Sequence, residues 1–135
     1  MFRIVLLFML LSSLLGCEQS QTDSQIVDCQ DLVKGCDIGL GQITFSQNPK
    51  QLAPFSITFS TWQSSGQLSA VNAQFMMQGM QMGFNRYRFI QEKNNTWQAN
   101  VILPVCMQGR ADWLMQLEIT ENGQTKKGVI PFKST

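Results

Sequence analysis

The stretch Phe55-Ser56-Ile57-Thr58-Phe59-Ser60 alternates strictly between large apolar and small polar side chains. Successive side chains of a β-strand point to opposite faces, so a strand here would bury both phenylalanines and the isoleucine on one face. An α-helix would instead scatter them around its circumference. The stretch therefore predicts a strand with one buried face, the kind found in antiparallel sheets.

The same period of two recurs along the chain from Gln42 onward. The other segments that show it are 42–46, 71–75, 85–91, 97–103, 113–119 and 129–133. Turn-forming residues separate them, among them Asn48-Pro49, Ser64-Ser65-Gly66 and Glu121-Asn122-Gly123. About seven short strands predict an all-β protein with a single immunoglobulin-like antiparallel β-sandwich. The only helical candidate is a short turn near 30–34.

Aromatic residues give expectations for individual side chains. We expect Tyr87 and Phe89 to face the core while the neighbouring arginines face outward. Trp113 is expected to anchor the core of the sandwich. Arg110 and Asp112, just before it, could pair across a turn, but the preferred interpretation is that they are exposed strand residues.

The N-terminus has the pattern of an export signal. Arg3 is followed by an unbroken apolar or small run from Ile4 to Leu15, which is too short to span a hydrocarbon core of about 30 Å. The run ends in Leu14-Leu15-Gly16-Cys17, which resembles the lipobox of bacterial lipoproteins. The resemblance implies cleavage before Cys17 and fatty-acyl chains such as palmitate on that cysteine. The alternative is an ordinary secretory signal with a cysteine nearby.

This interpretation divides the chain into three parts. Residues 1–16 are the signal peptide, 17–40 a lipidated tether and cysteine-bearing leader, and 41–135 the β-sandwich domain. Residues 18–25 carry no apolar side chain and are typical of a solvated tether. We expect the mature protein to be anchored by lipid to a cell membrane and to face the periplasm. Glu18 is not the aspartate that retains enterobacterial lipoproteins in the inner membrane, which favours the outer membrane.

Charge and composition exclude several classes of function. The chain has no histidine, ten basic residues and nine acidic ones. The missing histidine excludes Ser-His and Cys-His catalytic pairs, histidine-ligated zinc and histidine-rich Cu(II) sites. A near-neutral charge gives no basic face for nucleic acid. Without a catalytic motif or phosphate-binding loop, we expect a protein that is not an enzyme.

Three cysteines remain if Cys17 carries lipid: Cys29, Cys36 and Cys106. An exported protein meets an oxidising compartment, so two of them are expected to pair and one to be left over. A Cys29–Cys36 bond would staple a single turn and is the preferred pairing. A Cys36–Cys106 bond, which would pin the leader to the sandwich, is the alternative.

One segment interrupts the alternation: Phe75-Met76-Met77-Gln78-Gly79-Met80-Gln81-Met82-Gly83. Its glycines predict a loop or tight hairpin between strands. Thioether sulfur is a soft ligand that suits Cu(I). Methionine also fills irregular space in protein cores. On this segment alone, packing is the simpler interpretation.

The run Val71–Thr120 resembles the YtkA-like/FixH-like family of small exported β-sandwich domains. The elements that carry the resemblance are Met77-Gln78-Gly79-Met80-Gln81-Met82, Trp97-Gln98-Ala99 and Leu103-Pro104-Val105-Cys106-Met107-Gln108-Gly109-Arg110-Ala111-Asp112-Trp113. Gln78 stands where family members carry a proline, and Cys106 stands near a position where they carry a methionine. Members are often encoded with copper-handling or cytochrome-oxidase assembly functions.

The resemblance implies an accessory role in periplasmic copper handling, with a copper chaperone or oxidase subunit as partner. The cofactor would be Cu(I), bound by Met80, Met82 and Met77. Cys106 would join as a thiolate if it is not in a disulfide, and Met107 is a weaker candidate. The alternative is a metal-free envelope protein-protein interaction module that uses the methionine loop as an apolar contact surface.

Overall fold

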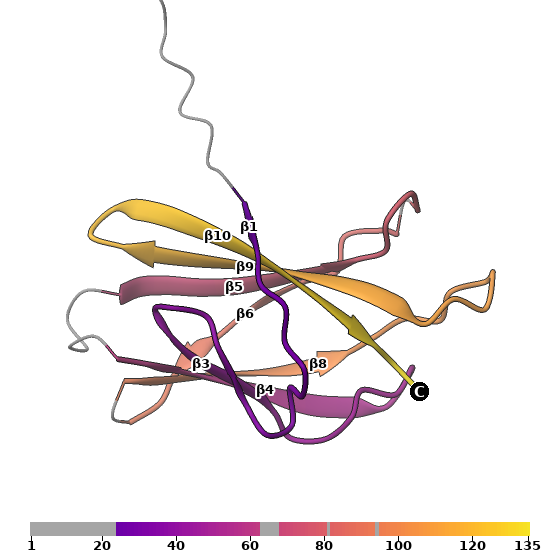
Figure 1. The fold of residues 1–135 in the computed structure, drawn as a ribbon, viewed down its shortest axis with the longest axis horizontal. Coiled ribbons are helices and arrows are strands. Elements are labelled where there is room, and N and C mark those ends of the chain that lie inside the picture. The colour runs from indigo at the N-terminus through magenta and orange to yellow at the C-terminus, as the bar shows by residue number, and fades with distance from the viewer. Residues whose placement is uncertain (1–23, 63–67, 81, 94) are drawn as a thin grey trace, which may run out of the picture.

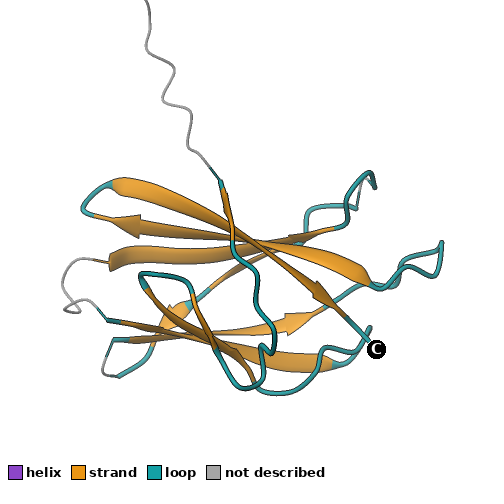
Figure 2. Cartoon of the chain, viewed as in Figure 1, coloured by secondary structure: helices purple, strands orange, loops and turns teal. Residues whose placement is uncertain are grey.

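The computed structural model describes residues 24–62, 68–80, 82–93 and 95–135 (Figure 1). Over these residues the chain forms ten strands in two five-stranded sheets, with no helix (Figure 2). The prediction of an all-β sandwich is confirmed, with three more strands than expected. In the described part of the chain, no helix is long and apolar enough to cross a membrane. The predicted signal peptide and Cys17 lie outside these residues.

The first sheet contains the two longest strands of the fold. Its order is β1 (Gln25–Ile26), β10 (Gln124–Lys133), β9 (Asp112–Glu121), β5 (Leu68–Met76) and β6 (Arg86–Arg88). β1 pairs parallel to β10, and all other neighbours are antiparallel. Asn122 and Gly123 connect β9 to β10 with φ values of 49° and 78°, the combination that a two-residue type I′ hairpin requires.

The second sheet contains the stretch whose alternation predicted the fold. Its order is β2 (Cys36–Asp37), β3 (Gly41–Phe45), β4 (Pro54–Thr61), β8 (Thr96–Ile102) and β7 (Ile90–Gln91), all antiparallel. β4 lies at its centre, where Phe55, Ile57 and Phe59 are all buried. Inward residues of this kind from both sheets form one core, because each sheet covers the apolar face of the other.

Trp113 anchors the core as expected. Its side chain is buried, and Nε1 donates a hydrogen bond to Oγ of Ser134 at 3.2 Å. A buried indole N–H needs a partner of this kind, since an unpaired buried donor is costly. The bond also fixes the C-terminal end of the chain beside β9.

The segment predicted as one strand over 85–91 divides into β6 and β7, which belong to different sheets. Phe89 lies between them, is buried, and donates its backbone N–H to the carbonyl of Val71 at 2.9 Å. The hydroxyl of Tyr87 donates to the carbonyl of Ile102 at 2.8 Å and accepts from its N–H at 3.2 Å. The inward orientation expected for both aromatic residues is confirmed, since Phe89 is buried and Tyr87 is partly buried against the core. Together they tie the two sheets together at this edge.

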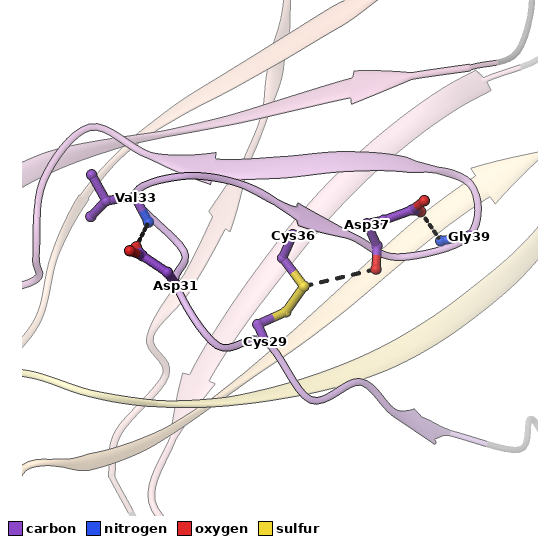
Figure 3. Close-up of a disulfide and its surroundings, with 6 residues drawn as sticks. All are labelled: Cys29, Asp31, Val33, Cys36, Asp37 and Gly39. Atoms are coloured by element: carbon purple, nitrogen blue, oxygen red, sulfur yellow. Dashed lines mark hydrogen bonds between the residues drawn. A yellow bond between two sulfur atoms is a disulfide. The ribbon is translucent and has the colours of Figure 1, made fainter.

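The leader packs against the sandwich through two short strands and a disulfide (Figure 3). Cys29 and Cys36 are bonded, with their Cα atoms 5.6 Å apart. The preferred pairing is thus confirmed, and the alternative with Cys106 is wrong because Cys106 is a free, buried cysteine. Between the bonded cysteines the chain turns at Leu32–Lys34, where the Asp31 carboxylate accepts a backbone hydrogen bond from Val33.

Candidate functional site

The methionine turn, residues 77–80, follows directly after β5. Met77 and Met80 form an isolated β-bridge, and the N–H of Met80 donates to the carbonyl of Met77 at 3.2 Å. Gly79 has φ of 73°, as the third residue of a type II turn requires. Gln78 occupies the preceding position, where proline is common in such turns. The expected tight turn between strands is therefore present.

The cysteine loop, residues 103–111, connects β8 to β9 at the same end of the sandwich (Figure 1, right). The N–H of Gly109 donates to the carbonyl of Cys106 at 2.9 Å, and Gly109 has φ of 68°. This local turn directs Cys106 inward, where only 3% of it is exposed. Its neighbour Met107 is 96% exposed. Two consecutive sulfur-containing side chains therefore point in different directions, Cys106 into the core and Met107 into solvent.

The thiol of Cys106 contacts the thioether of Met80. Sγ lies 3.3 Å from Sδ, close enough for the thiol to donate a weak hydrogen bond. The two residues are 26 positions apart in the sequence and come from different loops. Met77 is the first residue of the methionine turn, three positions before Met80, and it is buried in the core. Cys106 and Met80 are the pair of predicted ligands whose sulfur atoms the fold brings into contact.

A surface hollow lies beside Met80. It is lined by Gln74, Met76, Met80, Met82, Gly83 and Phe84. Met82 was a predicted ligand, but Met76 was not. The only signal for it was its position inside the methionine-rich segment. Met107, the weaker candidate, does not line this hollow.

Arg110 in the cysteine loop and Asp112 at the start of β9 form an ion pair. From the sequence this pairing was the alternative to the preferred interpretation as exposed strand residues. Nε of Arg110 donates to Oδ1 of Asp112 at 3.0 Å, and Nη2 donates to Oδ2. These side-chain bonds raise the pKa of Arg110, with smaller contributions from the charges of Asp112 and Cys106. The same bonds lower the pKa of Asp112. A positive charge is therefore held within electrostatic range of the cysteine.

The donor set of the site is soft. Among the described residues, no three His, Cys, Asp or Glu side chains are grouped so that they could hold a metal ion. What the fold gathers instead is one thiol and several thioethers, which suit Cu(I) rather than harder ions. Two sulfur ligands about 2.3 Å from one metal ion lie roughly 3.8 Å apart at a tetrahedral angle. The observed 3.3 Å between Sγ and Sδ needs only a small separation to accommodate an ion.

Comparison of the chain with protein-family models, with curated proteins and with solved structures finds no match. The function is accordingly inferred from the chemistry of the site and from the sequence motifs.

Proposed function

We propose that this protein is a periplasm-facing lipoprotein, held to the membrane by lipid on Cys17, that binds Cu(I) transiently as an accessory in copper handling or cytochrome-oxidase assembly. The observation that carries the proposal is the 3.3 Å contact between the free thiol of Cys106 and the thioether of Met80. The lipobox and the methionine-rich motif support it from the sequence.

The surroundings of Cys106 suit a soft cation better than they suit a structural thiol. The other two described cysteines have formed a disulfide, whereas Cys106 is free. Burial protects its thiol from chance oxidation, since reactive cysteines are accessible ones. Cu(I) is the soft ion that thiolate and thioether ligands select together. Cys106 and Met80 would hold the cargo, and Met77, the other methionine of the same turn, would be a further ligand.

Met80 provides a path from solvent to the buried thiol. It lines the surface hollow together with Met76 and Met82, and it also contacts Cys106. Cu(I) would arrive at the outer thioethers and move inward by exchanging one sulfur ligand for another. Release to a partner protein would follow the same route in reverse. Weak, exchangeable ligands are what a transient carrier requires.

The copper claim is tested by competition for Cu(I) between a chromogenic chelator and the soluble protein beginning at Glu18. We expect the wild type to bind one Cu(I) and the Met80→Leu and Cys106→Ser variants to bind at least tenfold more weakly. Met82→Leu should have a smaller effect. Met107→Leu is the matched control, because its side chain is exposed and outside the hollow. Equal Cu(I) affinity of the wild type and all four variants would contradict copper binding at Cys106 and Met80.

The anchoring claim is tested separately by fractionating cells that express the full chain. The wild type should sediment with membranes, and the chain from Glu18, exported on an ordinary cleavable secretory signal, should appear in the soluble periplasmic fraction, since two or three acyl chains hold a protein firmly while none holds it. Separation of inner and outer membranes on a density gradient tests the expected outer location. Recovery of the exported Glu18 chain with membranes, or of the wild type in the soluble fraction, would contradict lipid on Cys17 as the anchor.

A metal-free interaction module is the second candidate. The observation that favours it is the apolar surface of the loops at the site: Phe84 is 85% exposed, and Val105 and Met107 project from the cysteine loop. Exposed apolar patches of this kind mark contact surfaces for other proteins. Capture of an envelope partner that survives copper chelation, and that Phe84→Ser abolishes, would favour this function over copper binding.

A further inference from the structure

Arg110 connects three segments at the loop end of the sandwich. Its guanidinium binds both carboxylate oxygens of Asp112, and Nη1 donates to the carbonyl of Gln78 at 2.9 Å. Its own carbonyl accepts a hydrogen bond from Nε2 of Gln51 at 3.0 Å. One residue thus joins the start of β9, the methionine turn and the loop between β3 and β4.

The rigidity of this arrangement comes from Asp112. It is the first residue of β9, and it pairs with Lys133 in the longest ladder of the fold. An arginine that uses two N–H groups for a carboxylate has its planar fork fixed in orientation, and its remaining donors point in set directions. One of those donors meets the carbonyl of Gln78. Through Asp112 and Arg110, β9 therefore fixes where the methionine turn lies.

We propose that Arg110 is a positioning residue that clamps the methionine turn onto the cysteine loop and so keeps Sδ of Met80 against Sγ of Cys106. Gln78 and Met80 belong to the same four-residue turn. The hydrogen bond from Arg110 to the carbonyl of Gln78 therefore also restrains the thioether of Met80, two residues later. Without the clamp the turn keeps its internal bond between Met77 and Met80 but loses this link to the cysteine loop. The importance of the clamp for copper rests on the proposed function; its effect on the thiol does not.

The first measurement needs no copper. In the purified full-length chain, the rate at which iodoacetamide alkylates Cys106 reports how often the turn lifts from the thiol. We expect Arg110→Gln and Asp112→Asn to raise this rate roughly three- to tenfold. Asp112→Asn keeps the size of the side chain but removes the carboxylate that the guanidinium of Arg110 binds with two N–H groups. Lys126→Gln is the matched control, because it removes an ion pair with Glu121 at the opposite end of β9.

Arg110→Lys separates geometry from charge. Lysine keeps the positive charge near Cys106 but cannot bind a carboxylate with two N–H groups and reach a carbonyl with a third. We therefore expect Arg110→Lys to alkylate as fast as Arg110→Gln. Wild-type rates in Arg110→Gln, or full restoration by Arg110→Lys, would overturn the clamp. Equal near-ultraviolet circular dichroism in all variants establishes that each is folded.

The second measurement repeats the Cu(I) competition with the same variants. We expect affinity to fall in proportion to the loss of the closed turn, because only the closed turn holds both sulfur atoms together. The fall in affinity should be smaller than the rise in alkylation, which follows the open fraction of the turn. If alkylation accelerates while the wild type binds no Cu(I), the clamp stands and the copper function fails. If alkylation is unchanged in Arg110→Gln, the clamp fails whatever the copper affinity.

Discussion

Cys106 occupies a position that protects its thiol from oxidants. Its side chain is buried, and its sulfur contacts a thioether instead of a second thiol. The remaining described cysteines are bonded to each other on the leader. Thiol reactions need an accessible thiolate, so oxidants in the medium are expected to reach the exposed thioethers first.

Peroxide treatment of the folded protein should oxidise the methionines in the order of their exposure. Met107 should form sulfoxide first, because it is almost fully exposed, and the half-buried Met80 and Met82 should follow. Met77, which is 2% exposed, and the buried Met115 should react last. Peptide mass spectrometry over a time course measures this order. Met80 and Met82 reacting as slowly as Met115 would mean that the hollow is closed in solution.

The pair of Arg110 and Asp112 should make stability depend on pH in the acid range. Asp112 has a pKa lowered chiefly by hydrogen bonds from Arg110, with the charges of Arg110 and Lys133 adding to the effect. A carboxyl whose pKa is lower in the folded state stabilises the protein above its unfolded value of 3.8 and loses this effect as the pH falls. The gap between the urea midpoints of wild type and Asp112→Asn should therefore be fully present at pH 6 and should narrow progressively as the pH falls below 3.8. A gap independent of pH would show that the charge of Asp112 contributes nothing.

At the scale of elements, β3 tolerates no side chain at its first residue. A Cβ on Gly41 would lie 2.3 Å from the carbonyl oxygen of Ser60, in the neighbouring strand β4. We expect Gly41→Ala to cost about 1–3 kcal/mol, the range of an overpacked core substitution. Gly128→Ala, in β10, is the matched control, since its nearest contact would be 3.8 Å away. Urea unfolding compares the two, and a Gly41→Ala as stable as the control would contradict the close approach.

The sequence predicts well those strands that bury one face and expose the other. β4 and β9 bury one face against the opposite sheet, so their alternation is complete. β10 is longer than predicted because its polar N-terminal part pairs with β9 through the Asn122-Gly123 hairpin, independently of burial. β1 and β2 are two residues each, too short for any period to be recognised.

The candidate site could be predicted only as a set of residue types. The sequence identifies soft sulfur ligands in two segments, but their distance depends on how the loops after β5 and β8 meet. Met107 and Cys106 are neighbours in the chain, yet one is exposed and the other buried. That difference arises from the local turn at Gly109, whose positive φ has no marker beyond the glycine itself. The contact of Cys106 with Met80 is a property of the fold.

At the scale of the whole molecule, the disulfide should contribute substantially to stability. Closing the short loop between Cys29 and Cys36 restricts the unfolded chain, and the usual loop-entropy relation assigns about 2–3 kcal/mol to a loop of this length. We expect the Cys29→Ser/Cys36→Ser double variant to unfold at a correspondingly lower urea concentration. Adding reductant to the wild type should reproduce the loss. Cys106→Ser serves as the comparison, and it should show no response to reductant beyond that of the wild type.

The disulfide also determines how the protein bears mechanical load. A pull on the chain ahead of Ser24 acts first on β1, which the first sheet holds by only two residue pairs. The tension then passes at Cys29 across the bond to Cys36, in the second sheet, and bypasses the residues between. With the bond reduced, the six residues between the cysteines could extend. Seven residue steps at 3.3–3.6 Å each, less the 5.6 Å already between the two Cα atoms, would add roughly 20 Å of length. With the bond intact, both sheets therefore resist the pull and the attachment stays short. With the bond reduced, the segment between the two cysteines would lengthen under the same pull.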